Sequence, residues 1–294
     1  MKPPAVGSAP CPLCGGERYR PVAVMAAGCG RLVRCVSCGL LYQDPVPDES
    51  IRRHYDDVYH QDTISDHIDQ GRRSLFRRFL AEVRPFGYRR LLDVGCGSGE
   101  FLTLARQEGW TADGIEISMR GAALARRRGL AVHETPDDLP DGYYDAVTLW
   151  NVVDFFRRPV EQLREIQRVV APRGLVFVRT PNAIFQAAAW RLSRIVVWPP
   201  PVARLIADAY FFQPLIWSPS TLRMLLLSAG FTDVRLSNSP VSVGDPYRAH
   251  SRVRETVVDG VKRVVHQLAG AASTCSGGRL LLGSSISAVA RKPA

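Results

Sequence analysis

The sequence predicts an α/β protein with a mostly parallel sheet covered by helices on both faces, preceded by a small cysteine-rich ribbon. Two observations lead to this prediction. From residue 90 onward, short apolar runs alternate with amphipathic helical segments, which is typical of a parallel sheet. Upstream of residue 47, two C-x2-C pairs are separated by twenty residues, which is typical of a small metal-binding module. The 294 residues, 46% of them hydrophobic, suffice for one large core with such an appendage.

Four of the seven cysteines form the segments CPLC and CVSC near the amino terminus. Each C-x2-C pair turns two thiolates toward one point, and two pairs complete a tetrahedral four-sulfur shell, for which zinc is the usual ion. A pair of disulfides or a redox site would use the same residue type, but a cytoplasmic location disfavours the first and the second does not need two matched pairs. Since four protein ligands leave no open coordination position, we expect a structural zinc. The predicted ligands are Cys11, Cys14, Cys35 and Cys38.

No targeting or membrane-spanning segment is evident in the sequence. The opening MKPPAVGSAP lacks an apolar core of seven or more residues, and the apolar stretch 195–217 is interrupted by three consecutive prolines, Arg204 and Asp208. We therefore expect a cytoplasmic protein without a transmembrane helix. The formal net charge of +10 comes almost entirely from dispersed arginines, which favours a solvated surface over a nucleic-acid site.

Between the ribbon and the α/β domain, residues 48–88 are predicted to form a helical linker or cap. A first helix is expected after an N-cap at Asp48 or Ser50, with Tyr55 and Tyr59 on one of its faces. A second helix is expected over 74–87, where apolar residues recur at helical spacing before Pro85 and Gly87 end the pattern. The predicted division is then 1–47, 48–88 and 89–294.

The elements of the α/β domain are predicted from the alternation of apolar runs and amphipathic segments. Because crossovers between parallel strands are right-handed, the loops after the strands share one edge of the sheet, where ligands bind in open sheets of this kind. The predicted strands are 90–95, 111–118, 130–134, 144–150 and 174–180, and the helices between them are 99–109, 119–129 and 160–172.

The first predicted strand ends in a glycine-rich turn, LLDVGCGSGEF, with Asp93 just before the first glycine. Glu116 follows the next strand, where a carboxylate can accept hydrogen bonds from both hydroxyls of a ribose. Asp93 discriminates between nucleotide-like ligands, because a carboxylate repels a diphosphate and attracts the ammonium and sulfonium of S-adenosylmethionine. We therefore expect S-adenosylmethionine as the cofactor.

The segments LLDVGCGSGEFL and GIEIS resemble the class I S-adenosylmethionine-dependent methyltransferases. The resemblance continues through residues 139–182, 218–236 and 280–293, and covers roughly residues 88 to 292. It implies a Rossmann-like fold with a mostly parallel seven-stranded sheet. Together with CPLCGG and RCVSCGLLYQDPVP, the chain is similar to a zinc-ribbon subgroup of bacterial methyltransferases, several of which act on sugars or secondary metabolites.

The resemblance also implies roles for individual residues of the cofactor site. The glycine turn with Asp93 would hold the methionine portion, which Asn151 would also meet, and Glu116 would hold the ribose. Ile117 would line the adenine pocket, and the loop HETPDDLP would cap the base, with Asp137 or Asp138 as an acceptor for its amino group. The full predicted set is Asp93, Gly95, Gly97, Gly99, Glu116, Ile117, Thr135, Pro136 and Asn151.

One position departs from the family pattern. Where many relatives carry Glu-His after the fourth strand, this chain has Asp154-Phe155, so the imidazole proposed there as a base is absent. Asp154 is our candidate catalytic residue, as a base or as a hydrogen-bond partner of the acceptor. The alternative role for Asp154 is the N-cap of the helix that follows.

The insertion 183–217 is predicted to be a lid over the methyl acceptor, although packing of a lid against the core would use the same aromatic residues. The sequence thus predicts a methyltransferase acting on a small molecule such as a sugar, a glycolipid precursor or a secondary metabolite. A zinc-ribbon RNA methyltransferase and a non-catalytic cofactor-binding scaffold are the alternatives, and the oligomeric state is not predicted. The aromatic residues of the insertion are Trp190, Trp198, Tyr210, Phe211, Phe212 and Trp217.

Overall fold

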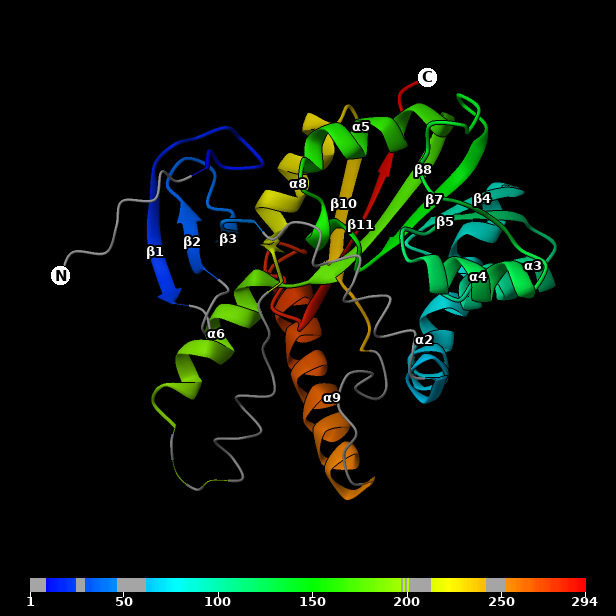
Figure 1. Cartoon of the computed structure of the whole chain (residues 1–294). Coiled ribbons are helices and arrows are strands. Elements are labelled where there is room, and N and C mark those ends of the chain that lie inside the picture. Colours follow the sequence, from blue (N-terminus) through cyan, green and yellow to red (C-terminus); the bar gives the residue numbers. More distant parts are fainter. Residues whose placement is uncertain are drawn as a thin grey trace.

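The computed structural model describes residues 9–24, 30–46, 62–196, 198, 200, 213–241 and 252–294. A large sheet with helices on both sides occupies the centre of the molecule, and a smaller sheet lies beside it at the amino-terminal end (Figure 1). The predicted helix that begins at Asp48 or Ser50, including Tyr55 and Tyr59, falls outside the described residues.

The large sheet has seven strands in the order β10-β11-β8-β7-β4-β5-β6. Every neighbouring pair from β8 to β6 is parallel, whereas β11 runs antiparallel to both β8 and β10. This arrangement confirms the predicted α/β, Rossmann-like methyltransferase fold. The strands are β4 (Arg90–Val94), β5 (Thr111–Ile115), β6 (Ala131–His133), β7 (Tyr144–Trp150), β8 (Val170–Pro181), β10 (Thr232–Asn238) and β11 (Ser285–Arg291).

Alternate residues along the central strands are buried against helices on opposite faces of the sheet. Leu91, Ala146 and Phe177 pack with α2 (Asp62–Val83), α3 (Glu100–Gln107) and α4 (Met119–Arg127). Leu92 and Val147 pack on the opposite face with α5 (Pro159–Val169) and α8 (Pro219–Ser228). Both faces of the sheet are therefore covered, which explains why its central strands read as continuous apolar runs. The other helices are α6 (Ala183–Ser193), α9 (Arg252–Cys275) and the short η1 (Arg84–Phe86) and η2 (Val153–Phe155).

Two boundaries differ from the prediction. The helix expected over 160–172 ends at Val169, and β8 begins at Val170 rather than at Gly174. The strand starts early because Val170 already pairs with Tyr144 of β7. The register of the two strands then shifts, and Arg173, with a φ of 62°, lies within this irregular part of β8. The helix expected over 74–87 is the second part of α2, which gives way at Val83 to a short 3₁₀ turn containing Pro85.

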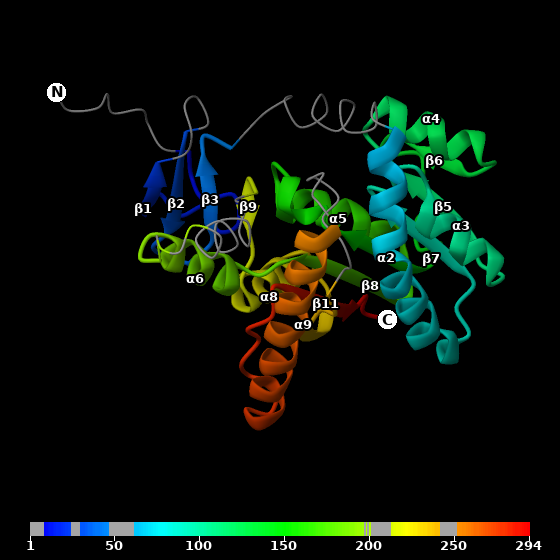
Figure 2. The same ribbon diagram turned by 90° about the horizontal axis from the view of Figure 1, so that it is seen from below.

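The small sheet contains β1 (Tyr19–Val24), β2 (Arg31–Cys35) and β3 (Leu41–Asp44), all antiparallel. Its fourth strand, β9 (Leu215–Ile216), comes from the insertion 183–217 and pairs with β3, Leu41 opposite Ile216 (Figure 2). The sequence analysis did not predict this strand. The ribbon is thus completed by a segment that follows five strands of the large sheet in the chain.

The ribbon and the large sheet share one hydrophobic core. Val33, Leu40 and Tyr42 of the ribbon belong to the same buried cluster as Trp217 and Leu222, which lie at the α5 and α8 face. All five side chains are at most 1% exposed. The ribbon is therefore packed into the molecule rather than tethered to it. In the described part of the chain, no helix is long and apolar enough to cross a membrane.

Candidate functional site

The carboxyl ends of four parallel strands meet at one edge of the large sheet. Val94 of β4 aligns with Ile115 of β5 and with Leu149 of β7. On the next strand, Trp150 of β7 aligns with Arg179 of β8. The glycine turn after β4 and the loops after β5, β7 and β8 consequently form a continuous rim, as expected for the ligand-binding edge of such a sheet.

The glycine turn has a shape that residues with a Cβ atom cannot readily copy. Gly95, Gly97 and Gly99 have φ angles of 72°, 55° and 84°, in the left-handed region. A Cβ on Gly95 would lie 2.5 Å from Cγ2 of Val152, and a Cβ on Gly99 would lie 2.1 Å from Cδ1 of Leu130. These two glycines therefore allow the turn to pack on the protein itself, which presents the backbone between them at the rim.

Glu116 joins the turn after β4 to the loop after β5. Its Oε2 accepts a hydrogen bond from the Gly97 N–H at 2.8 Å, and its Oε1 accepts one from the Ser118 N–H at 2.7 Å. A carboxylate oxygen can accept two hydrogen bonds, so one oxygen can bind a backbone amide and a ligand hydroxyl at the same time. A pair of vicinal hydroxyls is a ligand group that this buried carboxylate can hold.

Asp93 lies beneath the glycine turn, 3% exposed, and its Oδ1 accepts a hydrogen bond from Thr148 Oγ1 at 2.6 Å. Burial raises the pKa of the Asp93 carboxyl to about 8, while the Thr148 hydroxyl and the Arg72 guanidinium act in the opposite direction. A cationic ligand group beside Asp93 would favour the charged form in the same way as Arg72 does. The carboxyl of Asp93 is buried with little positive charge around it, so a cationic ligand group would be stabilised there.

The predicted adenine side lies next to Glu116, in the loops after β5 and β6. Ile117 is 44% exposed, and Thr135 is also exposed. Pro136 is held in place, since its carbonyl accepts a hydrogen bond from Arg168 Nη2 at 2.8 Å. These loops leave an accessible apolar surface beside the carboxylate of Glu116.

Asn151 follows β7 in a left-handed conformation, with φ of 58°. Its N–H donates to the Arg179 carbonyl at 2.8 Å, and its Oδ1 accepts from Arg179 Nη1 at 2.9 Å. Arg179 Nε in turn donates to Ser239 Oγ at 2.9 Å. Sequence analysis missed Arg179 and Ser239. The available signal was a single arginine in the apolar strand segment GLVFVRT.

Asp154 lies in η2 and is 1% exposed. Thr180 Oγ1 of β8 donates a hydrogen bond to its Oδ1, while Oδ2 is buried without a hydrogen-bond partner in the described structure. Burial raises the pKa of Asp154 to about 7, against the effect of the Thr180 hydroxyl. Asp154 does not cap the following helix, because the N-cap position of α5 is Arg158.

The predicted lid residues differ widely in their surroundings. Trp217, directly after β9, is fully buried, whereas Trp198 is 78% exposed. Trp190 lies on α6 with the Arg194 guanidinium 5.6 Å from its ring centre. The cluster of Tyr210, Phe211 and Phe212 lies outside the described residues.

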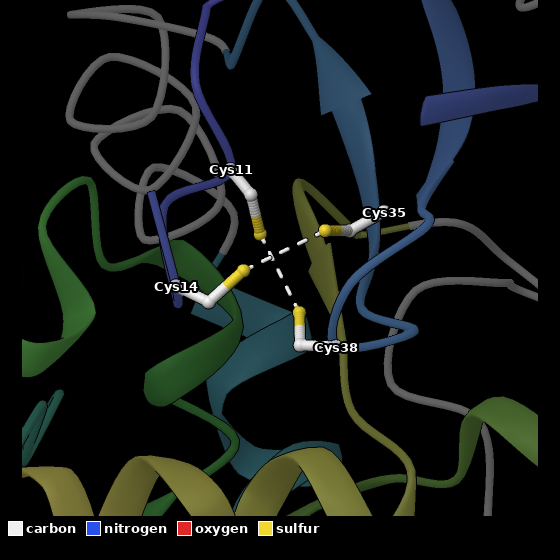
Figure 3. A group of neighbouring side chains, drawn as sticks. All are labelled: Cys11, Cys14, Cys35 and Cys38. Carbon is white, nitrogen blue, oxygen red and sulfur yellow. Dashed lines mark hydrogen bonds between the residues drawn. The ribbon is translucent and has the colours of Figure 1, made fainter. Parts of the chain in front are cut away.

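The four cysteines of the ribbon converge on one point (Figure 3). The Sγ atoms of Cys11 and Cys38 are 3.6 Å apart, as are those of Cys14 and Cys35, and all four lie within 4.8 Å of one another. These separations are too long for disulfide bonds. A tetrahedral ion with Zn–S bonds of about 2.3 Å would place the sulfurs about 3.8 Å apart, so the geometry fits zinc.

Comparison with known proteins identifies the family to which the chain belongs. A family model described as a methyltransferase domain matches residues 66–236, more than half of the chain. The chain belongs to this methyltransferase family. This is the family that the glycine turn with its two carboxylates predicts, the class I S-adenosylmethionine-dependent methyltransferases.

Curated relatives match part of the chain. A protein named ubiquinone biosynthesis O-methyltransferase from Caulobacter sp. strain K31 is 30% identical over 130 residues, 40% of this chain and 52% of the relative. A protein of the same name from Pseudomonas aeruginosa strain LESB58 is 30% identical over 105 residues, 32% of this chain and 45% of the relative. The chain thus spans about half the length of the curated relatives it matches.

Two solved structures share the fold of the methyltransferase. A chain from the complex between the Haloferax volcanii Trm112 methyltransferase activator and a methyltransferase gives a TM-score of 0.53 at 16% identity, covering 85% of this chain and 100% of that one. A Galdieria sulphuraria protein described as a sarcosine dimethylglycine methyltransferase gives 0.51 at 17% identity, covering 83% and 99%. At these identities the likeness concerns the fold alone.

Proposed function

We propose that the protein transfers the methyl group of S-adenosylmethionine to a hydroxyl of a small-molecule acceptor, such as a sugar, a glycolipid precursor or a secondary metabolite. The observation that carries this proposal is the pair of buried carboxylates, Asp93 and Glu116, on either side of the glycine turn. Glu116 accepts hydrogen bonds from the ribose hydroxyls, and the cationic methionine portion favours the ionised form of Asp93, which is then its counter-ion.

The remaining contacts to the cofactor are part of the same proposal. The backbone of Gly95, Gly97 and Gly99, together with Asn151, meets the methionine portion. Ile117, Thr135 and Pro136 line the adenine pocket, where the 44% exposure of Ile117 leaves an apolar surface for a flat base. When bound, the cofactor supplies an electrophilic methyl group, and the protein's task is to orient the acceptor in line with it. Orientation of this kind can lower a barrier by about 7 to 11 kcal/mol.

We propose Asp154 as the group that takes the proton from the acceptor hydroxyl. Its pKa of about 7 suits a general base near neutral pH, and Oδ2 has no other hydrogen-bond partner in the described structure. Because the side chain is 1% exposed, the acceptor reaches Oδ2 only if η2 moves outward. Relatives named as O-methyltransferases support oxygen as the methylated atom.

We further propose that Cys11, Cys14, Cys35 and Cys38 hold a structural zinc ion. Four thiolates at tetrahedral spacing leave no position for a substrate. The ion would hold the turns that lead into β1 and β3 in place, and through β9 it would support the insertion between β8 and β10.

The test of the function is incubation of the purified protein and S-adenosylmethionine carrying a labelled methyl group with fractionated small metabolites and, separately, with total RNA. We expect label in a small-molecule fraction. Label only in RNA would replace this proposal with an RNA methyltransferase, and binding of that RNA should then fall steeply with salt concentration. Cofactor binding without transfer to any fraction would indicate a scaffold.

A further inference from the structure

A row of polar side chains crosses four strands on the face of the sheet that α2 covers. Trp150 of β7 aligns with Arg179 of β8, Arg179 aligns with Ser287 of β11, and Ser287 aligns with Ser237 of β10. Side chains of directly paired residues lie on the same face of a sheet. Trp150 contacts Phe79 of α2 with ring centres 5.9 Å apart, which identifies the face. A polar row is unexpected there, because the rest of this face is apolar.

Arg179 is a buried cation whose hydrogen-bond partners are neutral. It is 6% exposed, with Nε bonded to Ser239 and Nη1 to Asn151, and Nη2 donates to no residue in the described part of the chain. Within the same part no carboxylate lies within 4.0 Å of it, and the nearby Asp154 has a pKa of about 7 and so provides only a partial negative charge at neutral pH.

Burial and a like-charged neighbour both disfavour the cationic form of Arg179. Burial lowers the pKa of Arg179 to about 10, and the like charge of Arg72 on α2 lowers it further, while Asp154 raises it. The guanidinium nevertheless stays protonated at neutral pH. A buried cation without a full counter-ion costs free energy that an anionic ligand would recover.

A pocket adjoins this cation. It is lined by the sheet residues Trp150, Phe177 and Ser287 and by α2, including Leu75 and Phe79 and the ion-paired Arg78 and Glu82. Ser239, the residue that accepts from Arg179 Nε, also lines it. The Nε1–H of Trp150 is buried without a hydrogen-bond partner in the described structure, so one of the lining residues carries an unused donor. The Ser237 and Ser287 hydroxyls, which also line the pocket, are hydrogen-bonded to each other at 2.9 Å. An indole N–H suits a ligand with an oxygen acceptor.

The position relative to the glycine turn suits a methyl acceptor. The end of β4 and Arg179 on β8 are separated only by β7, so two strand spacings of about 4.8 Å, about 10 Å in all, lie between them. Arg72 acts electrostatically on both Asp93 and Arg179, so both groups lie within electrostatic reach of one side chain of α2.

We infer that Arg179 binds an anionic group, a carboxylate or a phosphate, of the methyl acceptor, and that the adjoining pocket over Trp150 receives the part of the acceptor next to that anion. This inference rests on the proposed methyltransferase function and narrows its acceptor to acidic small molecules. Arg179 then selects the acceptor, while Asn151 and Ser239 orient its guanidinium.

The test uses the full-length protein and small metabolites separated on an anion-exchange resin. We expect the label from S-adenosylmethionine to enter only retained fractions, and phosphatase treatment of those fractions to distinguish a phosphate from a carboxylate. For the labelled acceptor, Arg179→Gln should lower kcat/KM about 30-fold or more, the loss that removal of one partner from a buried charge pair produces. Arg179→Lys should recover part of this loss, because it keeps the charge without the fork of donors.

Arg164→Gln is the matched control, because it removes the same charge from α5, where Arg164 bonds the Ser228 carbonyl on the opposite face. Each variant is also titrated with S-adenosylhomocysteine. If the wild type does not bind S-adenosylhomocysteine, the proposed function fails; if it binds and the label enters unretained fractions, only the anion inference fails.

A second measurement decides the case in which no fraction is labelled. The wild type, Arg179→Gln and Arg164→Gln are titrated calorimetrically with inorganic phosphate and with acetate at low ionic strength. We expect the wild type and Arg164→Gln to bind one of these anions and Arg179→Gln to bind it at least about 30-fold more weakly. Equal binding by all three proteins would overturn the inference, as would an absence of binding by the wild type.

Discussion

Thr180 Oγ1 donates a hydrogen bond to Asp154 Oδ1 and thereby ties the end of β8 to the turn that follows β7. The two residues are 26 positions apart in the chain and both are buried. The hydroxyl favours the ionised form of a carboxyl that burial would otherwise keep protonated. This pair therefore controls the pH at which Asp154 can accept a proton.

If Asp154 is the base, the activity of the wild type should rise with pH through about 7, because only the ionised form accepts a proton and burial has raised the pKa to about that value. Asp154→Asn should lower kcat/KM about 100-fold or more and remove this rise. Thr180→Val should move it to higher pH, since the hydroxyl lowers the pKa of Asp154. An unchanged pH profile in Asp154→Asn would assign the base to another group.

Gly95→Ala should destabilise the protein and weaken cofactor binding, because its Cβ would meet Val152 Cγ2 at 2.5 Å in a left-handed conformation. We expect a loss of about 2 to 5 kcal/mol in the free energy of unfolding, measured by urea denaturation. Gly109→Ala is the control, since its Cβ has no neighbour within 4 Å and only the backbone strain of about 1 to 2 kcal/mol applies. Adding Val152→Ala to Gly95→Ala should restore part of the loss; no restoration would show that the close contact is not its cause.

Glu116→Gln should weaken S-adenosylhomocysteine binding about 10- to 100-fold, because a neutral amide replaces a charged acceptor of the ribose hydroxyls. It also loses an acceptor for the Gly97 and Ser118 amides, so the melting temperature is recorded alongside the calorimetric titration. Glu161→Gln changes the same functional group at an exposed position in the first turn of α5, and this variant should bind S-adenosylhomocysteine like the wild type. Unaltered binding by a folded Glu116→Gln protein would exclude the ribose contact.

Elemental analysis should find about one zinc ion per chain in the wild type and none in Cys35→Ser. Since the ribbon shares a core with the large sheet, Cys35→Ser should lower the melting temperature of the whole molecule in one transition. Cys275→Ser is the control, because Cys275 is exposed and remote from the cluster. A wild type that is free of metal, or a variant that melts in two separate steps, would contradict this account.

The sequence predicted the sheet well where its local pattern is strong. Leu91 to Val94 and Tyr144 to Trp150 read as apolar runs because both faces of a central strand are buried, and the structure has β4 and β7 at those places. The start of β8 was missed because Val169 and Val170 continue the apolar periodicity of α5. Nothing local distinguishes the last turn of that helix from the first residues of the strand.

The parts of the site that could not be predicted depend on contacts distant in the sequence. Leu215 and Ile216 form a strand only because β3 offers free backbone groups, and two residues carry no periodicity. From the sequence, a helix cap was a slightly better interpretation of Asp154 than a base, and only the structure excludes it by placing Arg158 at the N-cap position of α5. Arg179 is not part of a recognisable sequence motif. Its proposed role depends on its burial and on its neutral hydrogen-bond partners Asn151 and Ser239, which only the structure reveals.

The pairing of β9 with β3 has a consequence for biosynthesis. The ribosome releases β1, β2 and β3 first, yet the edge of β3 stays open until Leu215 and Ile216 have emerged, after all of β4 to β8. The nascent chain therefore carries an exposed strand edge throughout translation of β4 to β8. The cysteines can bind a metal ion early in synthesis, but the four-stranded ribbon can form completely only after β9 has been synthesised.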